Sequence, residues 1–363
     1  MQSIKAAVCH AFNAPLVIED VLLDAPAAGQ VEVEIDAVAI CHSDISYQQG
    51  GFGGHLPAVY GHEAAGRITA IGTGVAAEYA VGDSVCVTLV RSCGHCPSCY
   101  SGHLSTCETP RDNTMGPLKT KDGGAVLQAM SCGAFAEKVV VDQSQIVKIP
   151  ADLGKDVASV ISCGVITGVG ASVLAANLRV GQDVVVIGAG GVGLNAIQGA
   201  RIAGARRIVA VDLMDEKLKI AKAFGATDAV SAKAAKPWRE VKAILGRGAD
   251  AVLVTVGVAQ VYDQAPRYLA PSGNVVMVGM PHGDQLTTFS PLNMADAGQG
   301  FIGSKMGNMV IKRDIPWIID LYKQGRLKLD ELISGRWRLD QINEAIADTL
   351  GGAAKRNVII FDR

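Results

Sequence analysis

Four cysteines lie within a fifteen-residue stretch, in the pattern C-x2-C-x2-C-x7-C at Cys93, Cys96, Cys99 and Cys107. Four thiolates arranged as a tetrahedron are the usual ligands of a structural zinc ion. Glycine and proline in the short spacers permit the tight turns that such a site requires. A disulfide pair is the alternative, but the N-terminus shows no export signal, and disulfides are rare in a reducing compartment. We therefore predict a closed structural zinc site in a lobe over residues 91–108, so that catalysis must occur elsewhere.

Composition and charge exclude several classes of function. A length of 363 residues predicts two domains, and a hydrophobic content of 49%, with a mean hydropathy of +0.27, suffices for two cores. A formal net charge of −2 makes nucleic acid or an anionic membrane an unexpected partner. The chain contains no run of about eighteen uninterrupted apolar residues, so we expect no membrane-spanning helix. We expect a cytoplasmic protein in which the cysteines outside the cluster are reduced thiols, with Cys132 buried and inert; these are Cys9, Cys41, Cys86, Cys132 and Cys163.

The chain up to about residue 160 shows short strand patterns interrupted by glycine and proline. The segment Val31–Val38 alternates apolar and other residues, and Gly82–Thr88 is a second example. Irregular loops between such segments carry most of the cysteines and histidines. This pattern predicts a β-rich, barrel-like region with long functional loops.

From about residue 183 the pattern changes to strands that alternate with helices. We predict a helix that reaches about residue 203 and another over 216–224, and the expected strands are 183–188, 207–212, 251–256 and 274–279. This alternation is typical of a doubly wound parallel sheet with helices on both faces. The final part of the chain predicts helices and a last strand over 357–361 that could rejoin the first domain.

The residues after the first of these strands form a G-x-G-x-x-G motif, Gly188 to Gly193, with Gly191 and Val192 inside it. Gly188 would allow a tight turn, Gly190 would let the backbone approach a pyrophosphate, and Gly193 would let the helix pack closely on the strand. The helix N-terminus would then attract the phosphates. The alternative is a glycine turn that only packs a helix. The flanking strand and helix favour a dinucleotide site.

The next strand ends in an acidic residue, Asp212. A carboxylate at this position accepts hydrogen bonds from the adenosine ribose and repels a 2′-phosphate. Leu213 and Met214 follow it, with no arginine to compensate. The sequence therefore predicts a preference for NAD over NADP.

Three further ligand-type residues are Cys41, His62 and Cys163. Taken singly, each reads as a core thiol or a structural histidine. Together, the segments Cys41–Asp44, Gly61–Glu63 and Ser162–Gly164 resemble the catalytic-zinc segments of the zinc-dependent medium-chain alcohol dehydrogenases. The cysteine cluster resembles the structural zinc lobe of that family, and the glycine motif stands where the family places it. The resemblance runs along essentially the whole chain.

This resemblance implies a GroES-like, β-rich catalytic domain over 1–164 and 305–363, and a Rossmann coenzyme domain over 165–304. It implies an NAD-dependent zinc alcohol dehydrogenase with two zinc ions per chain, acting on a small-molecule alcohol or aldehyde. A homodimer or homotetramer is expected. Two cysteines and a histidine leave one zinc position open, as in alcohol dehydrogenase itself. An alcohol held there would lose its proton more easily, and the alkoxide would release a hydride to the nicotinamide.

The roles of individual residues also follow from the resemblance. Ser43 would accept the alcohol proton and pass it to the cofactor ribose, Asp44 would hold His62, and Glu63 would tune the zinc without binding it. The remaining positions that match the family are cofactor contacts, at His42, Lys217, Val278 and Arg356, and substrate-pocket residues, at Phe52, Leu89, Ala129 and Met130.

Ser46 marks a departure from the family pattern. Some members carry a histidine there as the solvent end of the proton relay, and here water, His42 or His55 would have to take its place. The substrate pocket would also involve the loop over residues 108–130, whose sequence does not reveal a substrate.

Several other functions remain open. A zinc-free reductase of quinones or enoyl groups would lack the three ligands, and a polyol dehydrogenase would usually have glutamate at position 163. A non-catalytic NAD-binding zinc protein is disfavoured by the intact Ser43 and Asp44. A nicotinoprotein that retains NAD and uses an external acceptor remains open, as does a glutathione-linked hydroxymethyl (formaldehyde) dehydrogenase.

Overall fold

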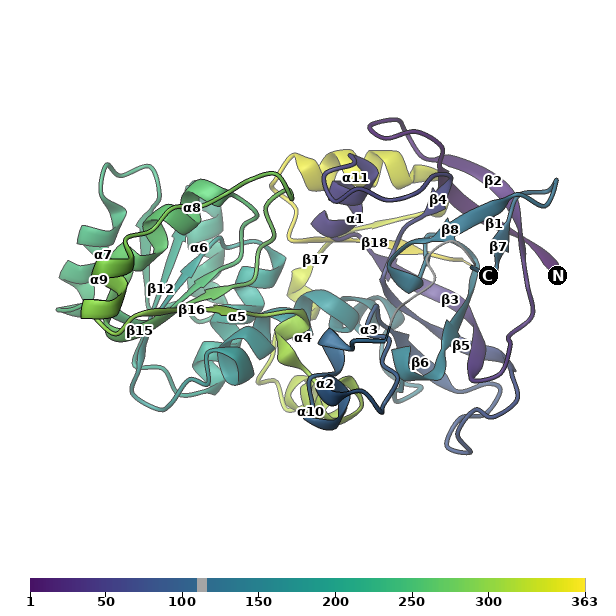
Figure 1. Cartoon of the computed structure of the whole chain (residues 1–363), viewed down its shortest axis with the longest axis horizontal. Coiled ribbons are helices and arrows are strands. Elements are labelled where there is room, and N and C mark those ends of the chain that lie inside the picture. The colour runs from purple at the N-terminus through teal and green to yellow at the C-terminus, as the bar shows by residue number, and fades with distance from the viewer. Residues whose placement is uncertain (110–115, 363) are drawn as a thin grey trace. The chain divides into compact units, whose positions relative to one another are not determined.

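The structure is a computed structural model that describes residues 1–109 and 116–362. The chain forms two compact units, one of Met1–Cys163 with Val310–Arg363 and the other of Gly164–Met309 (Figure 1). The chain returns from the second unit to the first between Met309 and Val310, which is later than the predicted boundary at 304/305. The reason is close packing, because a Cβ on Gly170 would lie 2.3 Å from the carbonyl oxygen of Gly307. The segment around Gly307 therefore belongs with the second unit.

The first unit contains a closed barrel and a larger sheet. The barrel strands, in spatial order, are β1 (Gln2–Cys9), β2 (Val17–Leu23), β7 (Leu118–Lys119), β8 (Ala125–Gln128) and β4 (Ala58–Val59). The larger sheet runs in the order β10 (Ile146–Lys148), β6 (Ser84–Val87), β5 (Glu63–Ile71), β3 (Gln30–Ala39), β18 (Arg356–Ile360) and β17 (Ile333–Trp337), with β9 (Lys138–Asp142) also paired to β3. Apolar side chains from both sheets form one buried core. The predicted β-rich region is confirmed.

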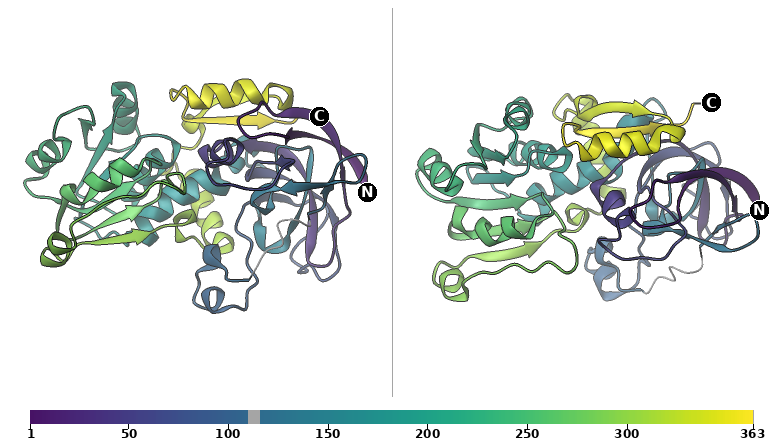
Figure 2. Two further views of the ribbon diagram at one scale, coloured as in Figure 1. Left: turned by 45° about the horizontal axis from the view of Figure 1, so that its top comes forward. Right: turned by 90° about the horizontal axis from the view of Figure 1, so that it is seen from above.

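The last strand rejoins the first unit, as the sequence suggested. Strand β18 pairs antiparallel with β3, and Val358 lies opposite Ala39. Figure 2 shows β18 and helix α11 (Ile342–Leu350), both yellow, side by side in the two views. Helix α10 (Ile311–Lys323) precedes them in the sequence. This return brings Arg356 into the sheet that carries the candidate site.

The second unit is built on a parallel sheet. Its spatial order is β13 (Asp228–Ser231), β12 (Arg207–Asp212), β11 (Asp183–Ile187), β14 (Ala249–Val254), β15 (Leu269–Met277) and β16 (Gly300–Gly303), and every pairing is parallel. The flanking helices are α5 (Gly191–Ile202), α6 (Asp215–Ala223), α7 (Pro237–Leu245), α8 (Ala259–Gln264) and α9 (Pro291–Asp296) (Figure 1). Numbered within this unit, the order is 3-2-1-4-5-6, which is that of a Rossmann fold. The predicted doubly wound sheet is confirmed.

One long helical stretch was not expected from the sequence. It comprises α3 (Lys155–Val160), the π-helical η4 (Ile161–Val165), α4 (Ile166–Gly170) and the π-helical η5 (Ala171–Ala175). Its glycines lower helix propensity, but they allow close packing. A Cβ on Gly168 would lie 2.3 Å from the carbonyl oxygen of Val192 in α5. Tertiary contact therefore overrides the local preference.

The same stretch, Lys155–Ala175, is the one helix among the described residues that is long and apolar enough to cross a membrane. Its most apolar window has a mean hydropathy of 2.0, and 83% of that window is buried inside the protein. The helices at the core of globular proteins also have this composition. The sequence criterion of an uninterrupted apolar run did not detect it because Ser, Thr and Gly interrupt the run.

Candidate active site and metal centres

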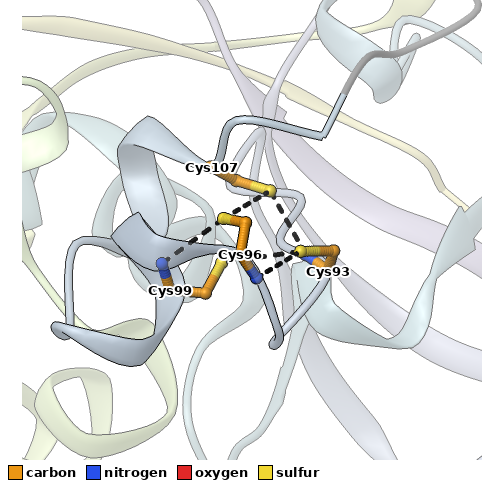
Figure 3. A group of neighbouring side chains, drawn as sticks. All are labelled: Cys93, Cys96, Cys99 and Cys107. Atoms are coloured by element: carbon orange, nitrogen blue, oxygen red, sulfur yellow. Dashed lines mark hydrogen bonds between the residues drawn. The ribbon is translucent and has the colours of Figure 1, made fainter.

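The four clustered cysteines converge on one point. Cys96 begins α2 (Pro97–Tyr100), Cys99 lies within that helix, and Cys107 follows η1 (Leu104–Thr106). The Sγ atoms of Cys93 and Cys99 are 3.9 Å apart and those of Cys96 and Cys107 are 4.0 Å apart. Figure 3 shows the sulfur atoms turned toward one another. Sulfurs at 2.3 Å from a tetrahedral zinc would lie about 3.8 Å apart, so the four ligands fit the ion.

The hydrogen bonds of Cys93 favour its thiolate form. The side chain of Thr109 and the backbone N–H groups of His95 and Cys96 contribute most to lowering the pKa of Cys93, to about 5. The backbone N–H groups of His95 and Cys96 lie 3.4 and 3.3 Å from its sulfur. Thiolate is the form that binds a metal. The lobe therefore holds at least one ligand ready to bind at neutral pH.

A second group of metal-type ligands among the described residues comprises Cys41, His62, Glu63 and Cys163. One ligand atom from each lies within 4.8 Å of those of the others, and all four residues are buried. Cys41 is the N-cap of α1 (His42–Gln48), His62 immediately precedes β5, and Cys163 lies in η4. The structure thus brings together the three predicted zinc ligands, which are far apart in the sequence.

Ser162 attaches the helical segment of Cys163 to the strand that follows His62. Its Oγ donates a hydrogen bond of 2.9 Å to the carbonyl oxygen of Ala64 in β5, and Ser162 is fully buried. The sequence pattern predicts no role for this hydroxyl. Its only sequence signal is that it directly precedes a predicted ligand.

His62 is oriented for a metal by its neighbour Asp44. The Oδ1 atom of Asp44 lies 3.0 Å from Nδ1 of His62, and both side chains are buried. The other ring nitrogen, Nε2, is buried and has no hydrogen-bond partner among residues 1–109 and 116–362. A buried polar atom of this kind normally has a partner. A metal ion at Nε2 would supply it, with Asp44 fixing the tautomer.

Asp44 also organises the backbone around the site. Its Oδ2 atom accepts the N–H of Cys41 at 3.1 Å, and its Oδ1 atom accepts the N–H of Gly61 at 2.9 Å. Burial alone would lower the pKa of His62, but the Asp44 carboxylate raises it well above its ordinary value. One carboxylate therefore orients both a thiolate segment and an imidazole.

The two thiols of this site, Cys41 and Cys163, influence the pKa values of each other. A hydrogen bond from Cys163 lowers the pKa of Cys41 well below its ordinary value, and the same bond raises the pKa of Cys163. Such a pair releases its protons in coupled steps. Because metal ligands must be deprotonated, metal binding here releases a proton.

Glu63 and Arg356 form a buried, hydrogen-bonded pair beside the ligands. Nη1 of Arg356 lies 3.2 Å from Oε1 of Glu63 and also donates to the carbonyl oxygen of Ile40 at 3.4 Å. Burial raises the pKa of Glu63 to about 8, although Arg356 opposes the change. Nε and Nη2 of Arg356 have no hydrogen-bond partner in the part of the chain that the structure describes. The sequence pattern predicts both residues in the site but gives no sign that they pair.

The candidate relay residues lie together on α1. Ser43 is half-buried near the start of this helix, and Ser46 lies three residues later. His42 is exposed at the first helical position, and His55 is exposed in the loop beyond the helix. Residues three apart are neighbours on a helix face. Ser43 and Ser46 therefore share one side of α1.

The glycine motif has the expected conformation. Gly188 has φ +96°, a value that favours glycine, and a Cβ on Gly193 would lie 1.8 Å from the carbonyl oxygen of Gly188. Gly190 is the N-cap of α5, and Gly191 and Val192 begin the helix. Open space surrounds a Cβ built on Gly190. The loop can therefore receive a ligand against its backbone.

Asp212 supports this loop as well as ending β12. Its Oδ2 atom accepts the N–H of Ala189 at 2.7 Å, and its Oδ1 atom accepts the N–H of Met214 at 2.9 Å. Each oxygen retains acceptor capacity for a ribose hydroxyl. Lys217 is half-buried in α6, in the turn that follows. No sequence pattern predicts that Asp212 also supports the glycine loop.

Val278 follows β15 and lines a cavity of about 270 Å³ together with Tyr262 and Met277. Its N–H donates to the carbonyl oxygen of Val254 at 3.0 Å. The predicted cofactor contact at Val278 therefore lies at the end of the strand that neighbours β14.

The four predicted pocket residues occupy different environments. The ring of Phe52 lies edge-on to that of Tyr47, with centroids 5.1 Å apart. Leu89 and Met130 are half-buried, whereas Ala129 is 3% exposed and packs in the barrel core. Of the predicted substrate loop, residues 110–115 lie outside the described residues.

Comparisons with known proteins cover the whole chain. Residues 27–151 match the family described as alcohol dehydrogenase GroES-like domain, and residues 191–324 match that described as zinc-binding dehydrogenase. The NDMA-dependent alcohol dehydrogenase of Amycolatopsis methanolica is 34% identical and covers 98% of each chain. The geraniol dehydrogenase of Castellaniella defragrans is 33% identical and covers 99% of this chain and 98% of its own.

A solved structure agrees with this assignment. The benzyl alcohol dehydrogenase of Acinetobacter calcoaceticus superposes with a TM-score of 0.94 and 28% identity, covering 100% of both chains. With its GroES-like and Rossmann units and its two clusters of zinc-type ligands, the chain is an oxidoreductase that belongs to the family of zinc-dependent medium-chain alcohol dehydrogenases.

Proposed function

We propose that the protein is an NAD-dependent zinc alcohol dehydrogenase that interconverts an alcohol and its aldehyde or ketone. The observation that carries the proposal is the buried set of Cys41, His62 and Cys163, in which Nε2 of His62 lacks a partner among the described residues. Two cysteines and one histidine form the ligand set of a catalytic zinc with one open position. The second zinc of each chain would occupy the cysteine lobe.

Zinc bound at this site would supply Lewis acidity that eases the loss of the hydroxyl proton of an alcohol, and NAD would supply the acceptor of the hydride. The residues of the chain prepare the site for this chemistry. Asp44 orients His62, and the Glu63–Arg356 pair places a buried carboxylate and a guanidinium beside the ligands. Ser43 would accept the hydroxyl proton, because a hydroxyl can accept one hydrogen bond and donate another.

NAD would be held mainly by the second unit. The glycine loop and the start of α5 would receive the pyrophosphate, and Asp212 and Lys217 would bind the adenosine ribose. His42 and the two unpartnered nitrogens of Arg356 would add positive or hydrogen-bonding groups for the phosphates. The carboxylate of Asp212 supports a preference for NAD over NADP.

A second candidate is an enzyme that retains NAD and passes electrons to an external acceptor. The description of the Amycolatopsis relative as NDMA-dependent favours keeping this candidate. The two candidates share the same site and differ in whether the cofactor leaves after each turnover.

The substrate class is the least constrained part of the proposal. A relative is a geraniol dehydrogenase and a solved relative is a benzyl alcohol dehydrogenase. The half-buried apolar side chains of Phe52, Leu89 and Met130 suit an alcohol with an apolar body. We propose such an alcohol, with a glutathione-linked hydroxymethyl adduct as a further substrate to test. A cytoplasmic homodimer or homotetramer completes the proposal.

One experiment separates these candidates. Zinc-loaded protein is mixed with NAD or NADP and with ethanol, geraniol, benzyl alcohol or hydroxymethylglutathione, and reduced cofactor is followed by absorbance. Continuous NADH formation with any alcohol supports the proposal. Reduction of bound NAD only, with turnover restored by an added acceptor, supports the second candidate. Absence of any cofactor reduction by protein that contains both zinc ions, with Cys163→Ala behaving identically, would overturn both.

A further inference from the structure

A strained turn lies beside the proposed substrate pocket. Met130 has φ +53° and Ser131 has φ +56°, so two consecutive non-glycine residues adopt the left-handed region, and Gly133 follows with φ +58°. Non-glycine residues occupy this region infrequently, and they persist there only when the surroundings hold them. Two glutamines supply these surroundings.

The first, Gln145, is 1% exposed and uses its whole amide. Its Nε2 atom donates to the carbonyl oxygen of Ser131 at 2.8 Å and to that of Thr88 at 3.0 Å. Its Oε1 atom accepts the N–H of Asp142 at 3.3 Å, and its own backbone carbonyl accepts the N–H of Thr88 at 2.9 Å. One buried side chain therefore joins two loop segments that are distant in the sequence.

The second glutamine holds the other end of the turn. Nε2 of Gln128 donates to the carbonyl oxygens of Cys132 at 2.8 Å and Val140 at 3.0 Å. Within the turn, the N–H of Cys132 donates to the carbonyl oxygen of Ala129 at 3.0 Å. The turn is therefore held on both sides by side-chain amides, of which that of Gln145 is buried and that of Gln128 is partly buried.

Beside this turn lies a cavity of about 70 Å³, lined in part by Gln128, Ser131 and Gln145. A turn that lost its hold would have space to relax, because no packed side chain fills this volume.

The carbonyls that Gln145 joins are those of Thr88 and Ser131, the immediate neighbours of Leu89 and Met130. We propose that Gln145 is a positioning residue that sets the spacing of Leu89 and Met130, and so determines how well a bulky apolar alcohol fits. This inference rests on the proposed function, because it takes Leu89 and Met130 as pocket residues. It adds a residue outside the pocket that controls specificity.

The test compares Gln145→Leu with Gln143→Leu, a matched control in the same 3-10 helix, η3 (Gln143–Gln145). The amide of Gln143 contacts the backbone of Gly74 and Ala76 instead. We measure kcat and KM for ethanol and benzyl alcohol. In Gln145→Leu we expect KM for benzyl alcohol to rise about tenfold or more, the size of a misfit in an apolar pocket. For ethanol, KM and kcat should stay within about threefold, and the Gln143→Leu protein should match the parent.

Two further variants serve if Gln145→Leu fails to fold. Gln145→Asn keeps an amide that is too short to reach both carbonyls, and Ser131→Gly relieves the left-handed strain while leaving Gln145 in place. Gln145→Asn should weaken benzyl alcohol binding selectively, whereas Ser131→Gly keeps the backbone carbonyl that Gln145 holds and should leave the KM for benzyl alcohol unchanged without lowering the melting temperature.

The outcomes are distinguishable. If Gln145→Leu and Gln145→Asn lower the melting temperature while the ratio of kcat/KM for the two alcohols equals that of the parent, Gln145 is only structural and the inference is wrong. If the parent oxidises none of the alcohols used to test the proposed function, that function fails first, and the inference fails with it. A selective change in benzyl alcohol KM that is absent from Gln143→Leu supports it.

Discussion

Asp44 and His62 form a buried pair in which Oδ1 of the carboxylate lies 3.0 Å from Nδ1 of the ring. The same carboxylate accepts the N–H groups of Cys41 and Gly61. Two candidate zinc ligands are therefore oriented by one residue that is not itself a ligand. Hydrogen-bond partners of this kind influence metal affinity strongly.

We predict that Asp44→Asn weakens zinc binding at this site about 10- to 100-fold. The asparagine is nearly isosteric with aspartate, but it lacks the negative charge that attracts the Nδ1–H group of His62. Zinc retention during titration with a competing chelator measures the effect, and the cysteine lobe should keep its ion. Unchanged zinc affinity in Asp44→Asn would show that His62 needs no help from this carboxylate.

We predict two zinc ions per chain with different roles, detectable by elemental analysis. Removal of Cys99 should lower the free energy of unfolding, because a closed zinc site contributes directly to folding. Removal of Cys163 should reduce activity far more than stability. A Cys163→Ala protein with the turnover of the parent would contradict this assignment, as would a fully loaded preparation that contains only one zinc.

Most of this architecture follows from sequence patterns, and the exceptions have a physical cause. The glycine motif and the ligand types of Cys41, His62 and Cys163 are visible because each needs a particular residue type. The helix from Lys155 to Ala175 was not predicted, because its glycines signal a turn until their packing partners, such as Val192, are known. Local propensity carries no information about a neighbour 24 residues away.

The site shows the same limit. The Glu63–Arg356 pair joins residues that β18 and β5 bring together, and no local pattern encodes that meeting. Ala129, predicted as a pocket residue, packs in the barrel core at 3% exposure, whereas the next residue, Met130, is half-buried with φ +53°. Residue types indicate the chemistry of a site, whereas topology decides which residues meet.

We predict that Asp212→Asn relaxes discrimination between NAD and NADP. The amide removes the charge that repels a 2′-phosphate, and its oxygen can still accept one of the bonds from Ala189 and Met214. Asp212→Gly should relax discrimination too, but with a larger loss of affinity for both cofactors, because the glycine loop loses its support. Ratios of kcat/KM for NAD and NADP provide the measurement. Equal efficiency of the parent with both cofactors would refute the role of Asp212.

We predict that Glu63 makes the protein lacking the active-site metal less stable as pH rises. Burial raises the pKa of Glu63 from 4.5 to about 8, so the folded state holds a proton there that the unfolded state has released. The contribution of Glu63 to the free energy of unfolding is complete below pH about 4.5 and is lost as the pH approaches about 8. Glu63→Gln cannot ionise, so its melting temperature should fall less over this range. If the melting temperature falls equally with pH in both proteins, Glu63 does not cause the loss of stability.

The last prediction concerns proton transfer from the alcohol. Ser43→Ala should reduce alcohol oxidation about 10²- to 10⁴-fold, the usual size of a general acid–base contribution, while zinc content stays unchanged. Ser43→Thr retains the hydroxyl and should recover most of the activity. This pair of variants separates the hydroxyl from the volume of the side chain.

Ser46 provides the second half of this test, because it lies three residues from Ser43 on the same side of α1. A serine hydroxyl does not titrate near neutrality, so Ser46 cannot be a terminal base, and Ser46→Ala should be nearly silent. Ser46→His would place a group with an ordinary pKa of about 6.5 next to Ser43. It should add an ionisation near that value to the pH dependence of kcat, with activity rising as the imidazole loses its proton. A large loss of activity in Ser46→Ala, with zinc and NAD binding intact, would instead make Ser46 a member of the relay.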